Sequence, residues 1–251
     1  MIDFHTHILP HLDDGARDTE MAKAMLNLEC KQGVTDVLFT PHYYGKKHSP
    51  DQFIEKRNAM SAHLQQFLPE GLNAHLGAEV HFTGVNVPDY DQLCKLAIGN
   101  TKYILLEFPF TNKWVGGLID KVADFVYETG YTPIIAHVER YAEVRKRPAY
   151  VTELLQIGCL LQVNSSAFTT KQEKNFAYAL LKKGGVHCIG TDTHDPTLRK
   201  PNLKETKELL QAEGYGEAWA KIQTNMQKIL QGERIETTPV PPIKKLFGKY
   251  L

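Results

Sequence analysis

Seven short apolar segments alternate with segments of helical periodicity along this 251-residue chain, and this alternation restricts the fold more than any other feature. The segments are expected strands, at residues 2–7, 34–40, 72–79, 102–107, 132–137, 159–164 and 186–192. Between them, apolar residues recur every three or four positions, which is typical of helices that pack on one face. Strands that alternate with helices form parallel sheets, and a (β/α) barrel takes about 250 residues. We therefore predict an α/β protein with a barrel, and a doubly wound open sheet is the alternative.

The composition excludes several classes of function. Lys and Arg total 29, as do Asp and Glu, so no strong field favours nucleic acid or membrane as a partner. No segment resembles a signal peptide or reaches the roughly 20 apolar residues of a membrane-spanning helix. The four cysteines are Cys30, Cys94, Cys159 and Cys188, and they form no CxxC motif. We expect buried free thiols and a cytoplasmic protein without membrane insertion.

The chain has no repeat and no linker of low complexity, so we predict one domain over residues 1–235. Residues 236–251 form a tail rich in Pro and Lys, which we expect to be mobile or docked in an extended conformation.

The first fifteen residues contain a pair of histidines. Ile2 and Phe4 alternate with Asp3 and His5, as in a short buried strand. If the extended conformation continues, His5 and His7 point to the same side and can bind one divalent cation.

Nearly every predicted strand ends in a residue that can bind metal. The strand ends are His5/His7, His42, Glu79, Glu107, His137, Asn164 and Asp192/His194. In a (β/α) barrel the carboxyl ends of the strands meet at one face, where the chemistry takes place. We therefore predict a metal site at this face and favour the barrel over the open sheet.

The types of ligand indicate which ions bind and what they do. Imidazoles and carboxylates without a cysteine cluster suit Mn, Fe or Zn. More than four ligands predict more than one ion, and a carboxylate such as Glu79 can bridge two ions. Clustered cations suit phosphoester hydrolysis, because they bind phosphoryl oxygens and activate water. The remaining histidines are assigned to the surface or the core, and His11 and His81 are the least certain of these.

These motifs together resemble the polymerase and histidinol phosphatase (PHP) family. Within it, the segments HTHILPHLDDG, NTKYILLEFPF, PIIAHVERY and KKLFGKYL are similar to the bacterial manganese-dependent protein-tyrosine phosphatases of capsule and exopolysaccharide operons. The resemblance covers essentially the whole chain. It implies a distorted, TIM-like (β/α)7 barrel and a cytoplasmic metal-dependent phosphatase.

The resemblance also implies a trinuclear manganese site, with Fe or Zn as alternative metals. It places the first ion on His5, His7, Glu79 and Asp192, and the second on Glu79, Glu107 and His137. It places the third ion on His42, His194 and an acid from Asp13-Asp14. Asp14 is preferred, since it directly precedes Gly15, and Asp13 stays an alternative.

Arg140 and Arg199 match arginines that face the substrate phosphate in this family. Guanidinium groups suit phosphate geometry and stabilise charge in the transition state. The implied mechanism is in-line attack on phosphotyrosine by a hydroxide that bridges the metals. No cysteine is followed by the x5-Arg spacing of the cysteine phosphatases.

The resemblance further implies that the substrate is the Tyr-rich tail of a bacterial tyrosine kinase that controls polysaccharide export. Residues 43–50 and 108–117 are expected to form an open rim for it. The alternatives are a histidinol-phosphate-type small-molecule phosphatase, an amidohydrolase, and a non-catalytic metal-binding regulator of the kinase. The zero net charge argues against a nuclease.

Overall fold

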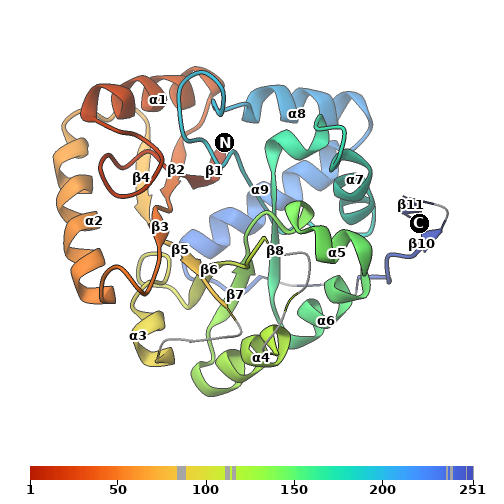
Figure 1. Ribbon diagram of the computed structural model, residues 1–251. Helices are drawn as coiled ribbons and strands as arrows, with labels where there is room; N and C mark the ends of the chain where they lie inside the picture. The colour runs from red at the N-terminus through yellow and green to blue at the C-terminus, as the bar shows by residue number, and fades with distance from the viewer. Residues whose placement is uncertain are drawn as a thin grey trace.

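The parallel strands of the chain curl into a distorted barrel with helices around it (Figure 1). The computed structural model describes residues 1–83, 89–110, 114, 117–235, 237, 240–246 and 248–250. Within these residues the barrel strands are β1 (Ile2–Thr6), β2 (Asp36–Phe39), β3 (His42–Tyr43), β4 (Asn73–Leu76), β5 (Glu79–His81), β6 (Tyr103–Glu107), β7 (Thr132–Ile135), β8 (Leu160–Asn164) and β9 (Cys188–Gly190). Both the α/β class and the barrel were therefore predicted correctly.

One predicted strand is divided in two, and another is followed by a further short strand that was not predicted. The strand predicted over 34–40 continues, after a break, as β3, and the strand predicted over 72–79 is split into β4 and β5. The breaks lie side by side, since Gly77 N donates to Phe39 O and Glu79 N donates to Pro41 O. Pro41 has no N–H to continue the ladder, which gives a physical reason for the break. Glu79 therefore begins a strand rather than ending one, contrary to the prediction.

Hydrogen bonds between the first and last strands close the barrel. The sheets run in the order β1-β2-β4 and β3-β5-β6-β7-β8-β9. Asp192 N donates to His5 O at 2.8 Å, and His7 N donates to Thr193 O at 2.9 Å. Segments from the two ends of the chain thus share one part of the wall.

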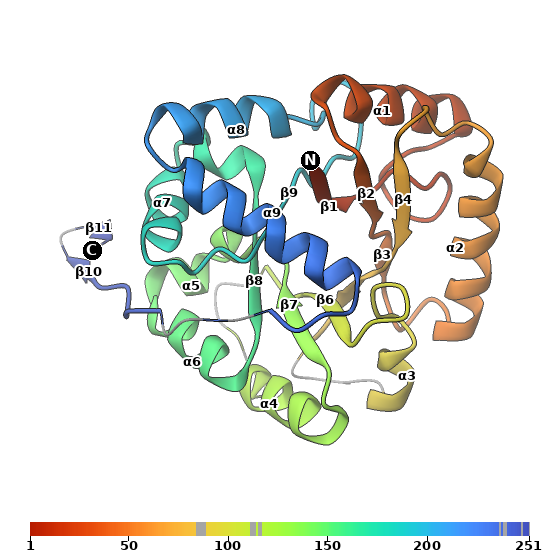
Figure 2. The same cartoon turned by 180° about the vertical axis from the view of Figure 1, so that it is seen from behind.

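The helices surround the strands and, in part, close the barrel. They are α1 (Thr19–Gln32), α2 (Pro50–Gln65), α3 (Tyr90–Cys94), α4 (Leu118–Thr129), α5 (Ala142–Lys146), α6 (Ala149–Ile157), α7 (Lys174–Lys182), α8 (Leu203–Ala212) and α9 (Gly216–Leu230). Figure 2 shows α9 crossing the barrel, where its Gln223 side chain accepts a hydrogen bond from Ile2 N. Trp219, Ile222 and Met226 of α9 are buried. This helix therefore covers the amino-terminal ends of the strands and leaves their carboxyl ends for chemistry.

Helix caps follow the sequence signals, but one helix was not predicted. Asp18 accepts a hydrogen bond from Met21 N at the start of α1, and Gly33 ends that helix in the left-handed conformation. The short helix α5 was missed, because five residues are too few to show a helical period.

The cysteines and the tail agree with the predictions in part. All four cysteines are free, and Cys159 and Cys188 are buried, but Cys30 is exposed, so its predicted burial was wrong.

In the tail, β10 (Lys245–Leu246) and β11 (Lys249–Tyr250) pair as an antiparallel hairpin. The side chains of Lys245 and Tyr250 donate to Arg145 O. Residues 236, 238, 239, 247 and 251 of the predicted tail lie outside the described residues.

His187 forms a buried polar contact in the wall of the barrel, away from the strand ends. Its Nδ1 accepts a hydrogen bond from Leu161 N at 3.2 Å, which requires a neutral ring at that atom. Burial, reinforced by Lys221, lowers the pKa of His187 from 6.5 to about 4.

We expect His187 to destabilise the fold in acid. Between pH 6.5 and pH 4 the unfolded chain binds a proton that the folded chain rejects, so the free energy of unfolding falls as the pH is lowered through this window. The contribution is at most about 3 kcal/mol. In His187→Asn, whose amide oxygen can accept from Leu161 N, this part of the pH dependence should disappear. Urea unfolding of both proteins at several pH values would measure it, and parallel pH profiles would contradict it.

Candidate metal centre

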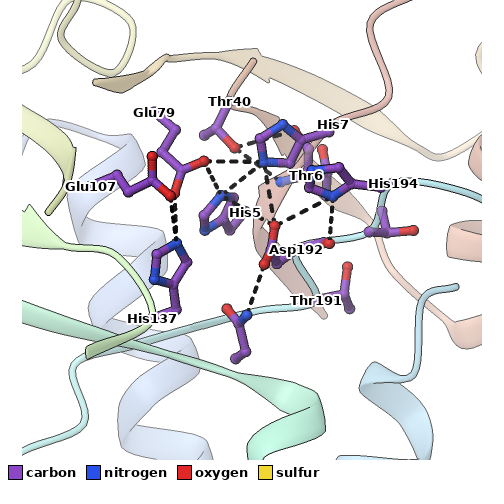
Figure 3. Close-up of polar contacts among 12 residues, drawn as sticks. His5, Thr6, His7, Thr40, Glu79, Glu107, His137, Thr191, Asp192 and His194 are labelled. Carbon is purple, nitrogen blue, oxygen red and sulfur yellow. Dashed lines mark hydrogen bonds and ion pairs between the residues drawn. The ribbon is translucent and has the colours of Figure 1, made fainter. Parts of the chain in front are cut away.

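The nine predicted metal ligands converge at the carboxyl-terminal end of the barrel. Figure 3 shows seven of them, which are His5, His7, Glu79, Glu107, His137, Asp192 and His194. They come from β1 and the loop after it, from β3, β5 and β6, and from the segments that follow β7 and β9. Three groups have ligand atoms within 4.8 Å of one another: His7, Asp14, His42 and His194; His5, His7 and Asp192; His42, Glu79 and Glu107. Residues from distant parts of the sequence thus form one polar cluster.

Glu79 lies in the middle of this cluster. Its Oε2 is 3.2 Å from His5 Nε2, 3.3 Å from His7 Nε2 and 2.9 Å from His42 Nδ1. Its Oε1 is 2.8 Å from His137 Nε2. One carboxylate therefore reaches imidazoles on both sides, which is the geometry needed to bridge two cations.

Contacts around the cluster set the tautomers of its histidines. The Nδ1 atom of His7 lies 2.7 Å from Asp13 Oδ2, and that of His194 lies 2.9 Å from the Asp192 carbonyl oxygen. Both contacts require a proton on Nδ1, which leaves Nε2 as the atom of each neutral ring that can bind a cation. These Nε2 atoms face other acceptors: His7 faces His5 Nε2 at 3.1 Å, and His194 faces Asp14 Oδ1 at 3.4 Å. These nitrogen and oxygen atoms, which have no hydrogen to share when the rings are neutral, are arranged to bind a cation between them.

Burial and neighbouring charges set the ionisation of the cluster. Burial favours the neutral form of Glu79 and Asp192, but the surrounding imidazoles outweigh it and hold the pKa of each acid well below its ordinary value. Burial and the neighbouring His7 lower the pKa of His194 to about 4. Burial lowers the pKa values of His5 and His7, but Glu79, Asp192 and Asp13 outweigh it and raise both. A cation that binds here would therefore displace protons from these rings.

The structure distinguishes the two adjacent acids of the first loop. The carboxylate of Asp13 is buried and accepts hydrogen bonds from Gly15 N and His42 N in addition to its contact with His7. Asp14 is largely exposed, and its Oδ1 lies 3.5 Å from His42 Nε2 and 3.4 Å from His194 Nε2. Asp13 thus orients His7, whereas the carboxylate of Asp14 is free to bind a cation.

Both predicted arginines lie against the cluster. Arg140 Nη1 is 3.0 Å and Arg199 Nη2 is 2.8 Å from the same oxygen, Asp192 Oδ2. The other oxygen of Asp192 faces His5 and His7. The Arg140 and Arg199 side chains are 35% and 43% exposed, so each can reach a ligand in solvent.

The backbone is unusual where it carries these residues. Among the described residues other than glycine, only His11, His137 and Asp192 have positive φ, at 62°, 31° and 54°. Such conformations are uncommon and concentrate at functional sites. Gly190 lies against β1 so closely that a Cβ atom there would be 2.6 Å from His5 N. A glycine is needed there for β9 to bring Asp192 beside His5.

Two amide side chains of β8, Gln162 and Asn164, connect residues of the cluster, and Gln162 was not predicted from the sequence. The Gln162 Oε1 atom accepts from His137 N at 2.6 Å and lies 3.3 Å from His5 Nδ1. Its Nε2 donates to Asn164 Oδ1, and Asn164 Nδ2 donates to Asp192 Oδ2. Gln162 precedes the strand-end residue Asn164 by two positions, and this strand period could have identified it.

The predicted rim is described in part. A cleft of about 720 Å³ adjoins Asp14 and His42 and is lined by Tyr43, Tyr44, Lys47 and His48, among others. In the second predicted rim segment, residues 108–117, Phe110 is half exposed. Residues 111–113, 115 and 116 of the predicted rim lie outside the described residues.

The two least certain histidines lie near the site. The Nδ1 atom of His81 is 3.4 Å from Glu107 Oε2, at the edge of the cluster, and His11 lines the cleft.

Comparison with known proteins places this site in context. Residues 1–231 match the family model for capsular polysaccharide synthesis proteins of the CpsB/CapC type. The chain is 30% identical to the tyrosine-protein phosphatase YwqE of Bacillus subtilis (strain 168) over 257 residues, 99% of each chain.

Two solved structures are also similar. One belongs to a study of YwqE from Bacillus subtilis and CpsB from Streptococcus pneumoniae, described as metal-dependent tyrosine phosphatases. It has a TM-score of 0.85 at 28% identity and covers 98% of this chain and 100% of its own. Histidinol phosphate phosphatase from Lactococcus lactis has a TM-score of 0.51 at 14% identity, covers 92% of each chain, and shares the fold alone.

We expect Gly190→Ala to disrupt the metal centre. The added methyl group would collide with the backbone of His5, so β1 and β9 must separate. We expect a loss of at least about 1–3 kcal/mol of stability and a lower metal content per chain. Gly216→Ala is the control, because a Cβ atom there meets its nearest neighbour at 3.8 Å. Elemental analysis and thermal unfolding would measure both effects, and a Gly190→Ala protein with full metal content would contradict the argument.

Proposed function

This chain belongs to the CpsB/CapC family of capsular polysaccharide synthesis proteins, and we propose that it is a metal-dependent phosphatase that hydrolyses phosphotyrosine in proteins. The observation that carries the proposal is the position of Asp192. One of its oxygens faces the imidazole cluster, and the other accepts from Arg140 and Arg199. A phosphoryl group placed there would contact the metal centre and both guanidinium groups together.

The residues fit three divalent ions, for which we propose manganese, with iron or zinc as alternatives. We assign the first to His5, His7, Glu79 and Asp192, the second to Glu79, Glu107 and His137, and the third to Asp14, His42 and His194. The support is the convergence of lone pairs around Glu79 and the absence of sulfur from these ligands. When bound, such ions neutralise phosphoryl oxygens and lower the pKa of the water that they bind.

We propose that Arg140 and Arg199 bind the phosphoryl oxygens. A phosphate monoester carries nearly two negative charges at neutral pH, and guanidinium groups offer paired N–H donors that match its geometry. Both arginines would exchange their contact with Asp192 Oδ2 for the substrate, since both are partly exposed. The tyrosine side chain leaves with a phenol pKa of about 10, so it needs less help from a general acid than an alcohol does.

We further propose that the substrate is a protein segment, and specifically the tail of a bacterial tyrosine kinase that controls polysaccharide export. The open cleft beside Asp14 and His42 provides space for residues next to the phosphotyrosine. The four free cysteines support a cytoplasmic setting. Among the described residues, no helix combines the length and apolar character needed to cross a bilayer.

The proposed activity should depend on metal and on Arg140. With added manganese, the protein should release phosphate from a phosphotyrosine peptide, and EDTA should abolish this release. In Arg140→Ala, kcat/KM should fall about 100-fold or more, as expected when a donor to the transition state is removed. Arg147→Ala is the matched control, because Arg147 pairs with Glu153 outside the cluster.

Other outcomes of this assay separate the alternatives. Alkylation of the exposed Cys30 should leave turnover unchanged. A preference for histidinol phosphate would assign the protein to the small-molecule phosphatases. No turnover of either substrate, with metal shown to be bound, would favour a non-catalytic regulator and contradict the proposed function.

Asp14 and Asp13 should differ in their effect on the metal. Asp14→Ala should bind one ion fewer per chain, because it removes a ligand of the proposed third ion. Asp13→Asn should retain the number of ions and bind them about 10–100-fold more weakly, because Asp13 only orients His7. Titration with manganese followed by elemental analysis would measure both effects. The reverse pattern would show that Asp13 is the ligand.

A further inference from the structure

Phe110 presents a half-exposed aromatic ring beside the metal centre. Among the described residues, the exposed large hydrophobic side chains are Phe110, Tyr127, Leu198 and Leu246. The Phe110 side chain is 51% exposed, although it follows the buried strand β6 by only three residues. An exposed phenyl ring at the edge of a polar site is a candidate contact for a ligand.

The ring is held in place by residues of the site itself. Its centroid is 5.3 Å from that of His137, and the two rings are stacked at 27°. The guanidinium carbon of Arg140 lies 4.8 Å from the same centroid. Phe110 therefore contacts both a proposed metal ligand and a proposed phosphate ligand.

The buried Tyr141 and the partly buried Trp114 support Phe110. Tyr141 packs against it with ring centroids 5.3 Å apart, and the Tyr141 hydroxyl accepts a hydrogen bond from Phe108 N. Trp114 in turn packs against Tyr141 at 5.6 Å. The position of the Phe110 ring is thus fixed before any ligand binds, while part of its surface remains open.

The chemistry of an aryl phosphate places a second ring close to this one. In phosphotyrosine a single ester oxygen separates the phosphorus atom from the ring, so the ring lies within a few ångströms of the phosphate. A phosphate held by Arg140 would therefore place the ring near Phe110, which already contacts that arginine. Aromatic pairs attract in offset-stacked and edge-to-face arrangements. An alkyl phosphate offers no such partner.

We propose that Phe110 is a specificity-determining residue whose exposed surface receives the aromatic ring of the substrate. This inference rests on the proposed function, since it assumes an aryl phosphate in the site. It assigns selection for aryl over alkyl groups to Phe110, and recognition of phosphate to the arginines and the metal centre.

Aryl and alkyl phosphates differ in their leaving groups, so their hydrolysis rates would differ even without Phe110. Phosphonates avoid this problem, because only their binding is compared. Phenylphosphonate and methylphosphonate have a P–C bond that is not hydrolysed, and they carry a phenyl and a methyl group, respectively, on the same phosphonate. Their binding to the manganese-loaded protein can be measured by calorimetry. We expect the wild type to bind phenylphosphonate more tightly. In Phe110→Ala this preference should fall about 5–10-fold, the size expected for the loss of an aromatic pair. Phe110→Tyr should retain it.

Controls separate recognition of the ring from damage to the site. Tyr127→Ala removes another exposed aromatic side chain, from α4, and should leave both affinities unchanged. Affinity for methylphosphonate and metal content should also be unchanged in Phe110→Ala. If methylphosphonate binding weakens as much as phenylphosphonate binding, Phe110 only supports Arg140 and His137, and the proposal is wrong. An unchanged preference in Phe110→Ala would equally overturn it.

Measurements on the wild type and on Phe110→Ala distinguish a failure of this inference from a failure of the proposed function. Hydrolysis of a phosphotyrosine peptide by the wild type tests the function, and the phosphonate preference tests Phe110. Turnover of the peptide without any effect of Phe110→Ala on the preference would reject the inference alone. No turnover by the metal-loaded wild type would reject the function.

Discussion

The candidate metal centre of this protein is organised around one buried carboxylate, Glu79, which contacts imidazoles from several segments of the barrel. Burying a carboxylate is costly unless charges and hydrogen bonds compensate, and here the compensation comes from side chains far apart in the chain. Each of those side chains must therefore be held at a fixed angle. Asp13 holds His7, the Asp192 carbonyl oxygen holds His194, and Gln162 contacts both His5 and His137. Each of these histidines thus has a defined hydrogen-bond partner that helps to fix its position.

The two ends of the barrel differ in structure: one is covered by apolar packing, and the other has an irregular backbone that carries the polar cluster. At the amino-terminal ends of the strands, α9 packs buried apolar side chains against the wall, and this packing stabilises the ring. At the carboxyl-terminal ends the wall is distorted: β2/β3 and β4/β5 are broken, and the backbone has positive φ at His137 and Asp192. In an unbroken strand, alternate side chains would point into the barrel at a fixed spacing. The break between β4 and β5 makes Glu79 the first residue of a new strand, and its side chain lies within the imidazole cluster.

Several features were predictable because they follow from local periodicity or residue chemistry. The period of a strand places His5 and His7 on one side, and their Nε2 atoms lie 3.1 Å apart. Parallel strands bring their ends together, which gathered His42, Glu107, His137 and Asp192 as predicted. Other features depend on contacts between distant segments and could not be predicted. Neither the different tasks of Asp13 and Asp14 nor the supporting role of Gln162 is visible in the spacing of residues.

By itself, the sequence determined the class of fold and the chemical types of the candidate metal ligands, because these depend on apolar patterning and on which side chains can bind metal. Only the tertiary structure decided which atoms meet. Hydrogen bonds close the ring between β1 and β9, and the missing side chain of Gly190 allows Asp192 to lie beside His5. That closure brings Asp192 to Arg140 and Arg199, and the packing of Phe110 on His137 and Arg140 places an aromatic ring next to them. These are long-range contacts set by packing and backbone geometry, and no local pattern of residues encodes them.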